Sequence, residues 1–167
     1  MSMIEGMLQE LEMEAQTTRR VLERVPDAKL GWRPHPKART LGELALHVAI
    51  VPGAVAQLAM TPSPAPAPQF GADPSPATAA DLLPVLDQSI ADAKRTLSGV
   101  NDAKAMELWT VALDGREVFT IPRIAFLRSI MLNHWYHHRG QLSTYLRQLD
   151  VPVPSIYGPS ADENPFR

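Results

Sequence analysis

Prolines divide this chain into segments more firmly than any other feature of its sequence. Of its 16 prolines, six lie within residues 61–77, and Pro34 and Pro36 interrupt residues 28–38. A proline has no backbone N–H and its ring fixes φ, so neither stretch can continue a helix or an inner strand. We therefore expect two connectors here, and regular structure only in the segments that they separate.

Apolar residues in those segments recur at the three- and four-residue spacing of amphipathic helices. The spacing predicts four helices, over residues 2–25, 40–60, 78–97 and 122–149. Two of the starts match a capping box, in which the side chains of two residues three apart satisfy each other's backbone N–H groups. These pairs are Thr40 with Glu43 and Thr78 with Asp81.

The segment before the last predicted helix has a different character. Residues 107–123 alternate around Asp114-Gly115, a dipeptide typical of a tight type I′ turn, and they predict a short hairpin or an extended excursion. Within the second helix, Pro52 and Gly53 predict a kink or an early end. Four helices joined by connectors predict an all-α fold, an antiparallel four-helix bundle.

Length and charge restrict the class of protein. The 167 residues are enough for one core, so we expect residues 1–167 to form a single domain with residues 61–77 as its proline-rich connector. The net charge of -2 gives no general attraction to nucleic acid or to an anionic membrane. We recognise no membrane span and no signal peptide, and expect a bacterial cytoplasmic protein. The absence of cysteine excludes disulfides, thiolate metal ligands and a cysteine nucleophile.

Three of the five histidines lie within five residues of the last predicted helix, in the segment LNHWYHHRGQLSTYLRQL. His134 and His138 are one turn apart on its apolar stripe, and such an i, i+4 pair can offer two imidazoles to one metal ion. His137 is rotated by about 100° from His138, and we assign it, like His35, to the surface or to the surroundings of the site. On the second helix, His47 occupies a position of the inward stripe where an apolar side chain is expected.

Two interpretations of these histidines compete. A single helical histidine is usually a hydrogen-bonded side chain, and an i, i+4 pair alone does not change that interpretation. Three inward imidazoles without partners would instead leave buried polar atoms unsatisfied. We therefore favour a site in which His47, His134 and His138 bind one divalent metal ion. Three imidazole ligands leave positions open for water or substrate, as catalytic sites do.

Two further residues of the last helix are candidates for the surroundings of this site. Gln141 lies on the histidine stripe, where it either hydrogen-bonds a ligand or forms a buried amide paired with the backbone. Tyr145 lies one turn further on and is either a core residue or a phenol that faces the cavity. We expect Arg139 and Arg147 to point outward, and Gly140 predicts a close helix crossing. No catalytic residue is assigned.

The stretches LGWRPHPKARTLGELALHVA and NHWYHHRGQLSTYLRQLDVPVPSIYGPSADE together resemble the DinB-like (DinB/YfiT) metalloenzyme superfamily. The resemblance covers nearly the whole chain, and the combination of the two distant motifs is specific. It implies a four-helix bundle with a divalent metal ion, commonly zinc or nickel, held at His47, His134 and His138. It also favours a homodimer.

The superfamily includes thiol transferases that join bacillithiol, mycothiol or glutathione to electrophiles, a maleylpyruvate isomerase, and members without known activity. The resemblance implies thiol S-transferase chemistry, in which the metal lowers the pKa of a low-molecular-weight thiol that attacks a small electrophile. A metal-dependent hydrolase is an alternative, but no glutamate lies beside these histidines as in H-E-x-x-H. A non-catalytic metal-binding or stress-response protein is another. We expect small-molecule partners, and neither nucleic acid nor membrane as partners. We also expect a homodimer, to which the alanine- and methionine-rich first helix and the pair Trp135 and Tyr136 contribute apolar surface.

Overall fold

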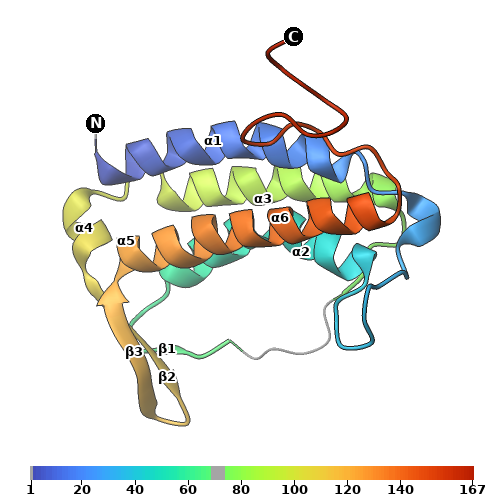
Figure 1. Ribbon diagram of the computed structural model, residues 1–167. Helices are drawn as coiled ribbons and strands as arrows, with labels where there is room; N and C mark the ends of the chain where they lie inside the picture. Colours follow the sequence, from blue (N-terminus) through green and yellow to red (C-terminus); the bar gives the residue numbers. More distant parts are fainter. Residues whose placement is uncertain (1, 69–73) are drawn as a thin grey trace.

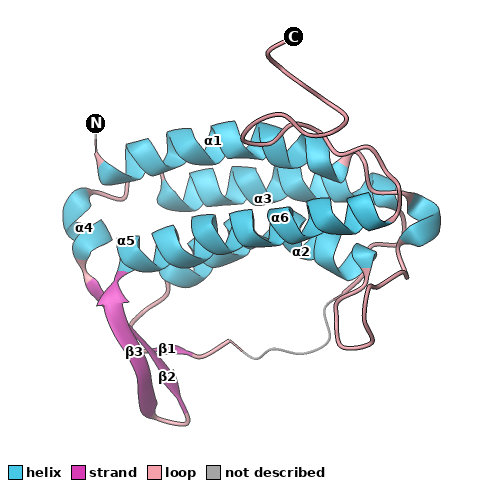
Figure 2. Ribbon diagram, in the orientation of Figure 1, coloured by secondary structure: helices cyan, strands magenta, loops and turns pink. Residues whose placement is uncertain are grey.

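The computed structural model describes residues 2–68 and 74–167, and it is mostly helical with a small sheet (Figure 1, Figure 2). The helices are α1 (Met3–Leu22), α2 (Leu41–Ala59), α3 (Leu82–Leu97), α4 (Asp102–Met106), α5 (Arg123–Phe126) and α6 (His134–Gln148). A π-helix, η3 (Leu127–Asn133), joins α5 to α6, and 3₁₀ turns form η1 (Asp27–Lys29) and η2 (Ala79–Asp81). The long predicted helices are present near their expected positions, whereas the short α4 was not predicted.

Helices α1, α2, α3 and the α5–η3–α6 segment lie side by side, and α2 packs against both α3 and α6 (Figure 1). Helices α1 and α6 run in one direction, and α2 and α3 run in the other (Figure 1). The prediction of an antiparallel bundle is therefore wrong for the neighbours α2 and α3. The reason is the proline-rich connector: between Ala59 and Leu82 the chain returns along α2, a distance of about 28 Å at 1.5 Å per residue.

The fold is mostly helical, as expected, but it is not strictly all-α, because strands β1 (Ala65–Pro66), β2 (Leu108–Leu113) and β3 (Arg116–Pro122) form a sheet in that order (Figure 2). Strands β2 and β3 are the predicted hairpin, and the turn residues Asp114 and Gly115 have φ angles of 51° and 75°, as a type I′ turn requires. Strand β1 pairs in parallel with β2. That pairing was not predicted, since it uses only two residues of the proline-rich connector.

Helix α2 is predominantly apolar. In the part of the chain that the structure describes, it is the one helix whose length and composition would allow it to cross a membrane. This helix was not recognised as a candidate from the sequence. Of its most apolar 18-residue window, 56% is buried inside the protein, including Leu44, Val48 and Val51. Burial of this extent is typical of a helix in a protein core.

Pro52 lies inside α2 without ending it. In an α-helix the N–H of residue 52 bonds to the carbonyl of residue 48, so the proline leaves the Val48 carbonyl without a partner in its own helix. The indole Nε1–H of Trp135, on α6, donates to that oxygen at 2.7 Å. Trp135 is 0% exposed, so this bond joins α2 to α6 inside the core. Helix α2 continues through Pro52 because a neighbouring helix supplies the missing donor.

Gly53 marks a close crossing of α2 and α3. Its N–H donates to Ser89 Oγ at 2.9 Å, and Ser89 Oγ donates to the Ile50 carbonyl at 3.0 Å. A Cβ atom at Gly53 would lie 2.8 Å from the Ser89 carbonyl oxygen, so a larger residue would push the helices apart. The crossing predicted at Gly140 is wrong, since a Cβ atom there would meet nothing within 4 Å.

Arg139 is buried, with 1% of its surface exposed, whereas it was expected to point outward. Its guanidinium pairs with the Glu14 carboxylate at 2.6 Å and donates to the hydroxyls of Thr18 and Tyr157. The periodicity of α6 could not indicate this, because α1 and the C-terminal tail cover that side of the helix. A buried guanidinium is tolerated there because a carboxylate accompanies it. Arg147 does point outward and pairs with a carboxylate of the tail.

Trp135 and Tyr136 do not provide the apolar surface that was expected for a homodimer. Trp135 is fully buried, and Tyr136 is half-buried and donates its hydroxyl to Glu10 at 2.9 Å. The homodimer therefore has no support from these two residues and stays a prediction of the family resemblance.

The bond between Trp135 and the Val48 carbonyl can be tested with a double-mutant cycle. Trp135→Phe removes the donor. We expect the free energy of unfolding to fall by about 1–3 kcal/mol for the buried carbonyl that loses its partner, in addition to the loss from the smaller ring. Pro52→Ala supplies a helical N–H to the same oxygen. Trp135→Phe should therefore lower the free energy of unfolding less in the Pro52→Ala background than in the wild type. The interaction energy of the cycle, measured by urea unfolding, should be about 0.5–3 kcal/mol. Equal losses in both backgrounds would contradict the assignment, because the smaller ring leaves the same cavity in each.

Candidate metal centre

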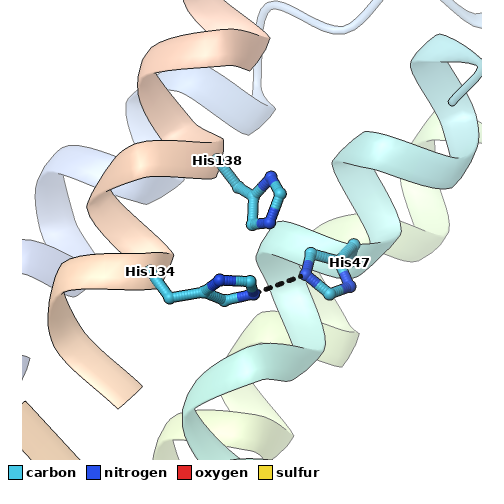
Figure 3. Close-up of side chains that lie close together, drawn as sticks. All are labelled: His47, His134 and His138. Atoms are coloured by element: carbon cyan, nitrogen blue, oxygen red, sulfur yellow. Dashed lines mark hydrogen bonds between the residues drawn. The ribbon is translucent and has the colours of Figure 1, made fainter. Parts of the chain in front are cut away.

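Three histidine side chains from two helices point toward one another (Figure 3). His47 comes from α2, and His134 and His138 come from α6. The Nε2 atoms of His47 and His134 are 3.2 Å apart, and one ring nitrogen from each of the three lies within 4.8 Å of the others. The rings are steeply inclined to one another, with interplanar angles of 75° and 85°. The structure thus brings together the three histidines that the helical stripes selected.

The positions of His134 and His138 follow from their place on the last helical segment. They are one turn apart at the start of α6, so their side chains leave the helix in nearly the same direction. The π-helix η3 ends immediately before His134. A π-helical turn holds more residues than an α-helical turn, so η3 determines which way the first side chains of α6 point around the helix axis. Such segments are frequent at functional sites. Helical periodicity in the sequence did not indicate it.

His47 is positioned by bonds on either side of it in α2. The capping box of Thr40 and Glu43 is formed, with the Glu43 N–H donating to Thr40 Oγ1 at 3.2 Å, and it sets where the helix starts. On the other side, Val48 carries the carbonyl that accepts from Trp135. Trp135 is in turn the neighbour of a histidine on α6. This bond therefore holds the two helices together at the level where the three imidazoles meet.

Burial favours the neutral form of the His134 and His138 imidazoles. Burial lowers the pKa of His138 to about 4, against the opposing effect of its hydrogen bond with Gln141 and with help from the nearby imidazoles and Arg39. Burial also lowers the pKa of His134, and the charges of His137 and Arg39 act in the same direction. Both side chains are therefore uncharged at neutral pH, and each has one unprotonated ring nitrogen able to bind a metal ion.

Gln141 contacts His138 directly, with its Oε1 atom 2.7 Å from the imidazole Nδ1. Since an amide oxygen accepts, the proton of His138 is on Nδ1, and Nε2 is left unprotonated. Gln141 was expected either to hydrogen-bond a ligand of the site or to pair with the backbone. Its contact is with the imidazole of His138. A bond of this kind orients an imidazole and increases its basicity toward a metal ion.

Tyr145 lies against the connector that precedes α2. Its ring packs edge-on against Trp32, with centroids 5.5 Å apart, and its hydroxyl donates to the Arg39 carbonyl at 3.4 Å. Burial raises the pKa of Tyr145, so the phenol stays protonated at neutral pH. Tyr145 thus joins α6 to this connector. His35 and His137 are exposed.

The chemistry of the donor set fits a divalent transition metal. His47, His134 and His138 offer three imidazole nitrogen ligands, and in the described ranges 2–68 and 74–167 no carboxylate belongs to the group. Imidazole binds zinc, nickel, copper and iron alike. Three protein ligands leave at least one position for a substrate, which is the arrangement of a catalytic site.

Comparison with known proteins points to one family. The model of the DinB family matches residues 1–165. The uncharacterized protein YrdA of Bacillus subtilis is 28% identical over 163 residues, which are 96% of this chain and 91% of YrdA. A DinB-like protein of Bacillus cereus superposes with a TM-score of 0.69 at 25% identity, over 92% of this chain and 97% of that one. The DinB-like protein YjoA of Bacillus subtilis, at 15% identity, shares the fold, with a TM-score of 0.64 over 89% and 96% of the two chains.

The lowered pKa of His138 should make the metal-free protein sensitive to acid. The unfolded chain takes up this proton near pH 6.5 and the folded chain only near pH 4, so the unfolded state binds more protons in between. The free energy of unfolding should therefore fall as the pH decreases through this window, by at most about 1.4 kcal/mol per pH unit for this histidine. Urea unfolding across the window measures the slope. His138→Gln should make it shallower, and the exposed control His35→Gln, whose side chain does not act on either histidine pKa, should leave it unchanged.

Gln141→Leu should weaken the binding of Zn²⁺ or Ni²⁺ by about 10- to 100-fold, because His138 loses the acceptor that orients it. Competition with a chromophoric chelator measures the affinity. Gln148→Leu, at the exposed end of the same helix, is the matched control and should bind like the wild type. If both variants bound the metal equally well, the hydrogen bond to His138 would have no role at the site.

Proposed function

The chain belongs to the DinB family, and on that basis we propose that it is a metal-dependent enzyme whose His47, His134 and His138 hold one divalent ion. The observation that carries the proposal is the convergence of three imidazole nitrogens from α2 and α6 within 4.8 Å. The neutral state of the two α6 imidazoles supports it, because no proton has to be displaced at neutral pH. Zinc and nickel are the ions that we favour for this site.

For the reaction we propose thiol S-transferase chemistry on small electrophiles. An ion bound here would lower the pKa of a thiol and make its thiolate available at neutral pH. The chain has no cysteine, so the sulfur has to come from a low-molecular-weight thiol. That sulfur forms a bond to the electrophilic carbon, the leaving group departs with its electron pair, and the thiol proton goes to solvent.

The residues around the cluster have roles that suit this reaction. Gln141 orients His138 through the Nδ1–H bond. The Trp135–Val48 bond keeps the two helices at a constant separation. A hydrolase would need a carboxylate to accept a proton from water, and within the described part of the chain the cluster contains none. We therefore place thiol transfer before hydrolysis.

Metal content is the first test of the proposal. Protein purified without an affinity tag, and reconstituted with Zn²⁺ or Ni²⁺, should hold about one ion per chain by elemental analysis. His47→Ala, His134→Ala and His138→Ala should each lose it. His35→Ala and His137→Ala are the matched controls, since both side chains are exposed and should keep the ion. A wild-type protein that binds no ion even after reconstitution would overturn the proposal.

Thiol consumption then separates catalysis from metal storage. The metal-loaded protein should accelerate the loss of free thiol in the presence of small electrophiles, and the three alanine variants should not. An ion bound at full stoichiometry, a large loss of stability on chelation and no thiol turnover with any electrophile would instead support a non-catalytic metal-binding protein.

A further inference from the structure

Three side chains in the first turns of α6 tie the histidine-bearing part of this helix to other helices. They are Trp135, Tyr136 and Arg139, and they follow His134 and His138 closely in the chain. The indole of Trp135 donates to a carbonyl of α2, whereas the hydroxyl of Tyr136 and the guanidinium of Arg139 reach α1. The part of α6 that carries both histidines is therefore bonded to two different helices.

Two carboxylates of α1 receive the bonds from α6. Glu10 accepts from the Tyr136 hydroxyl at 2.9 Å, and Glu14 pairs with the Arg139 guanidinium at 2.6 Å. The same guanidinium donates to the backbone carbonyl of Glu14 at 3.2 Å. Glu10 and Glu14 are four residues apart on α1, so their side chains leave that helix on one face. This face of α1 is thus matched to α6 by hydrogen bonds, which have a preferred direction.

Each of these carboxylates is itself held by a second partner. Arg128, on η3, donates to both oxygens of Glu10, at 2.8 and 2.6 Å. The Tyr157 hydroxyl, on the C-terminal tail, donates to Glu14 at 3.0 Å. Glu10 and Glu14 therefore each bind one guanidinium and one phenol. Such multiple bonds restrict the positions that the two carboxylates can take.

The bond to Arg139 restrains how far α6 can rotate about its own axis. Arg139 follows His138 directly, so its side chain points about 100° around the axis from the imidazole. A rotation of about 10° would move an atom at the outer radius of the helix, about 6 Å, by about 1 Å. Distances from a metal ion to its ligands vary by only about 0.2 Å. The meeting of His134 with His47, at 3.2 Å between their Nε2 atoms, therefore requires a fixed rotation of α6 (Figure 3).

We propose that Glu14 is a positioning residue of the metal centre, acting through Arg139 to set the rotation at which α6 presents His134 and His138 to His47. The inference rests on the proposed function for the metal ion, whereas the meeting of the three rings is a feature of the structure. A buried ion pair is often no more stabilising than an apolar pair of similar volume. The contribution of this pair is therefore to direction, which apolar contacts do not have.

Glu14→Gln tests the proposal, because it keeps the size of the side chain and removes the charge that Arg139 pairs with. We expect the affinity for Zn²⁺, measured by competition with a chromophoric chelator, to fall about tenfold. Glu12→Gln is the matched control, since Glu12 is on the same helix and pairs with Lys94 of α3 instead. It should bind Zn²⁺ like the wild type. An unchanged affinity in Glu14→Gln would overturn the proposal.

A double variant separates positioning from a merely stabilising role. Glu14→Gln leaves a buried guanidinium without its counter-charge and should lower the urea midpoint of unfolding. Glu14→Leu/Arg139→Met replaces the pair with apolar side chains and should recover that midpoint. Its Zn²⁺ affinity should nevertheless stay about tenfold below that of the wild type. If the affinity recovered together with the midpoint, the ion pair would only stabilise the fold, and the proposal would be wrong.

A measurement without metal distinguishes failure of this inference from failure of the proposed function. The NMR signals of the ring nitrogens of His47 and His134 report on their contact in the metal-free protein. Glu14→Gln should shift these signals, and Glu12→Gln should not. A shift in a protein that binds no ion would support the role of Glu14 and contradict the proposed function. Unchanged signals in Glu14→Gln would overturn the inference, whether or not the wild type binds Zn²⁺.

Discussion

The hydrogen bond from Trp135 to the Val48 carbonyl is the interaction on which the geometry of the site depends. A proline within a helix normally weakens it, because a carbonyl loses its donor. Here the lost helical bond becomes a bond between helices, at the level of the histidine cluster. The indole can donate only one hydrogen bond, and the carbonyl lies at a set depth of α2, so the pair determines the relative register of α2 and α6. A core of alkyl side chains alone would determine that register less strictly, because apolar contacts have no direction.

Interactions within a helix were predictable from the sequence, whereas of the interactions between helices only the approach of His47 to His134 and His138 was. The i, i+4 relation of His134 and His138 and the capping box at Thr40 depend on neighbours three or four residues apart, and the structure has both. The prediction that Arg139 points outward was wrong because its partners Glu14 and Tyr157 are distant in the chain. A charged residue on the edge of an apolar stripe looks the same whether it faces water or a buried carboxylate.

Pro52 shows how part of this gap could be closed. A proline inside a predicted helix leaves the carbonyl four residues before it without a helical donor, so its position identifies the one carbonyl that needs a donor from elsewhere. A tryptophan on another apolar helix is a natural candidate, because its indole N–H needs a partner when it is buried. Parallel α2 and α3 could similarly have been inferred from the connector, since antiparallel neighbours need only a short loop. The pairing of β1 with the hairpin was harder to predict, because the two paired residues of β1 have no strand pattern in the sequence.

The parallel run of α2 and α3 has a consequence for how proteins of this architecture can diverge. A chain that must return about 28 Å needs only about nine extended residues, and here about 22 residues lie between the two helices. The surplus is nearly neutral to folding, since doubling the length of a flexible loop costs only about 0.6 kcal/mol in closure entropy. Insertions and deletions between β1 and α3 can therefore accumulate without disturbing the helices or their histidines. Natural variation can be concentrated in one replaceable segment while the helical scaffold that carries the three histidines stays constant.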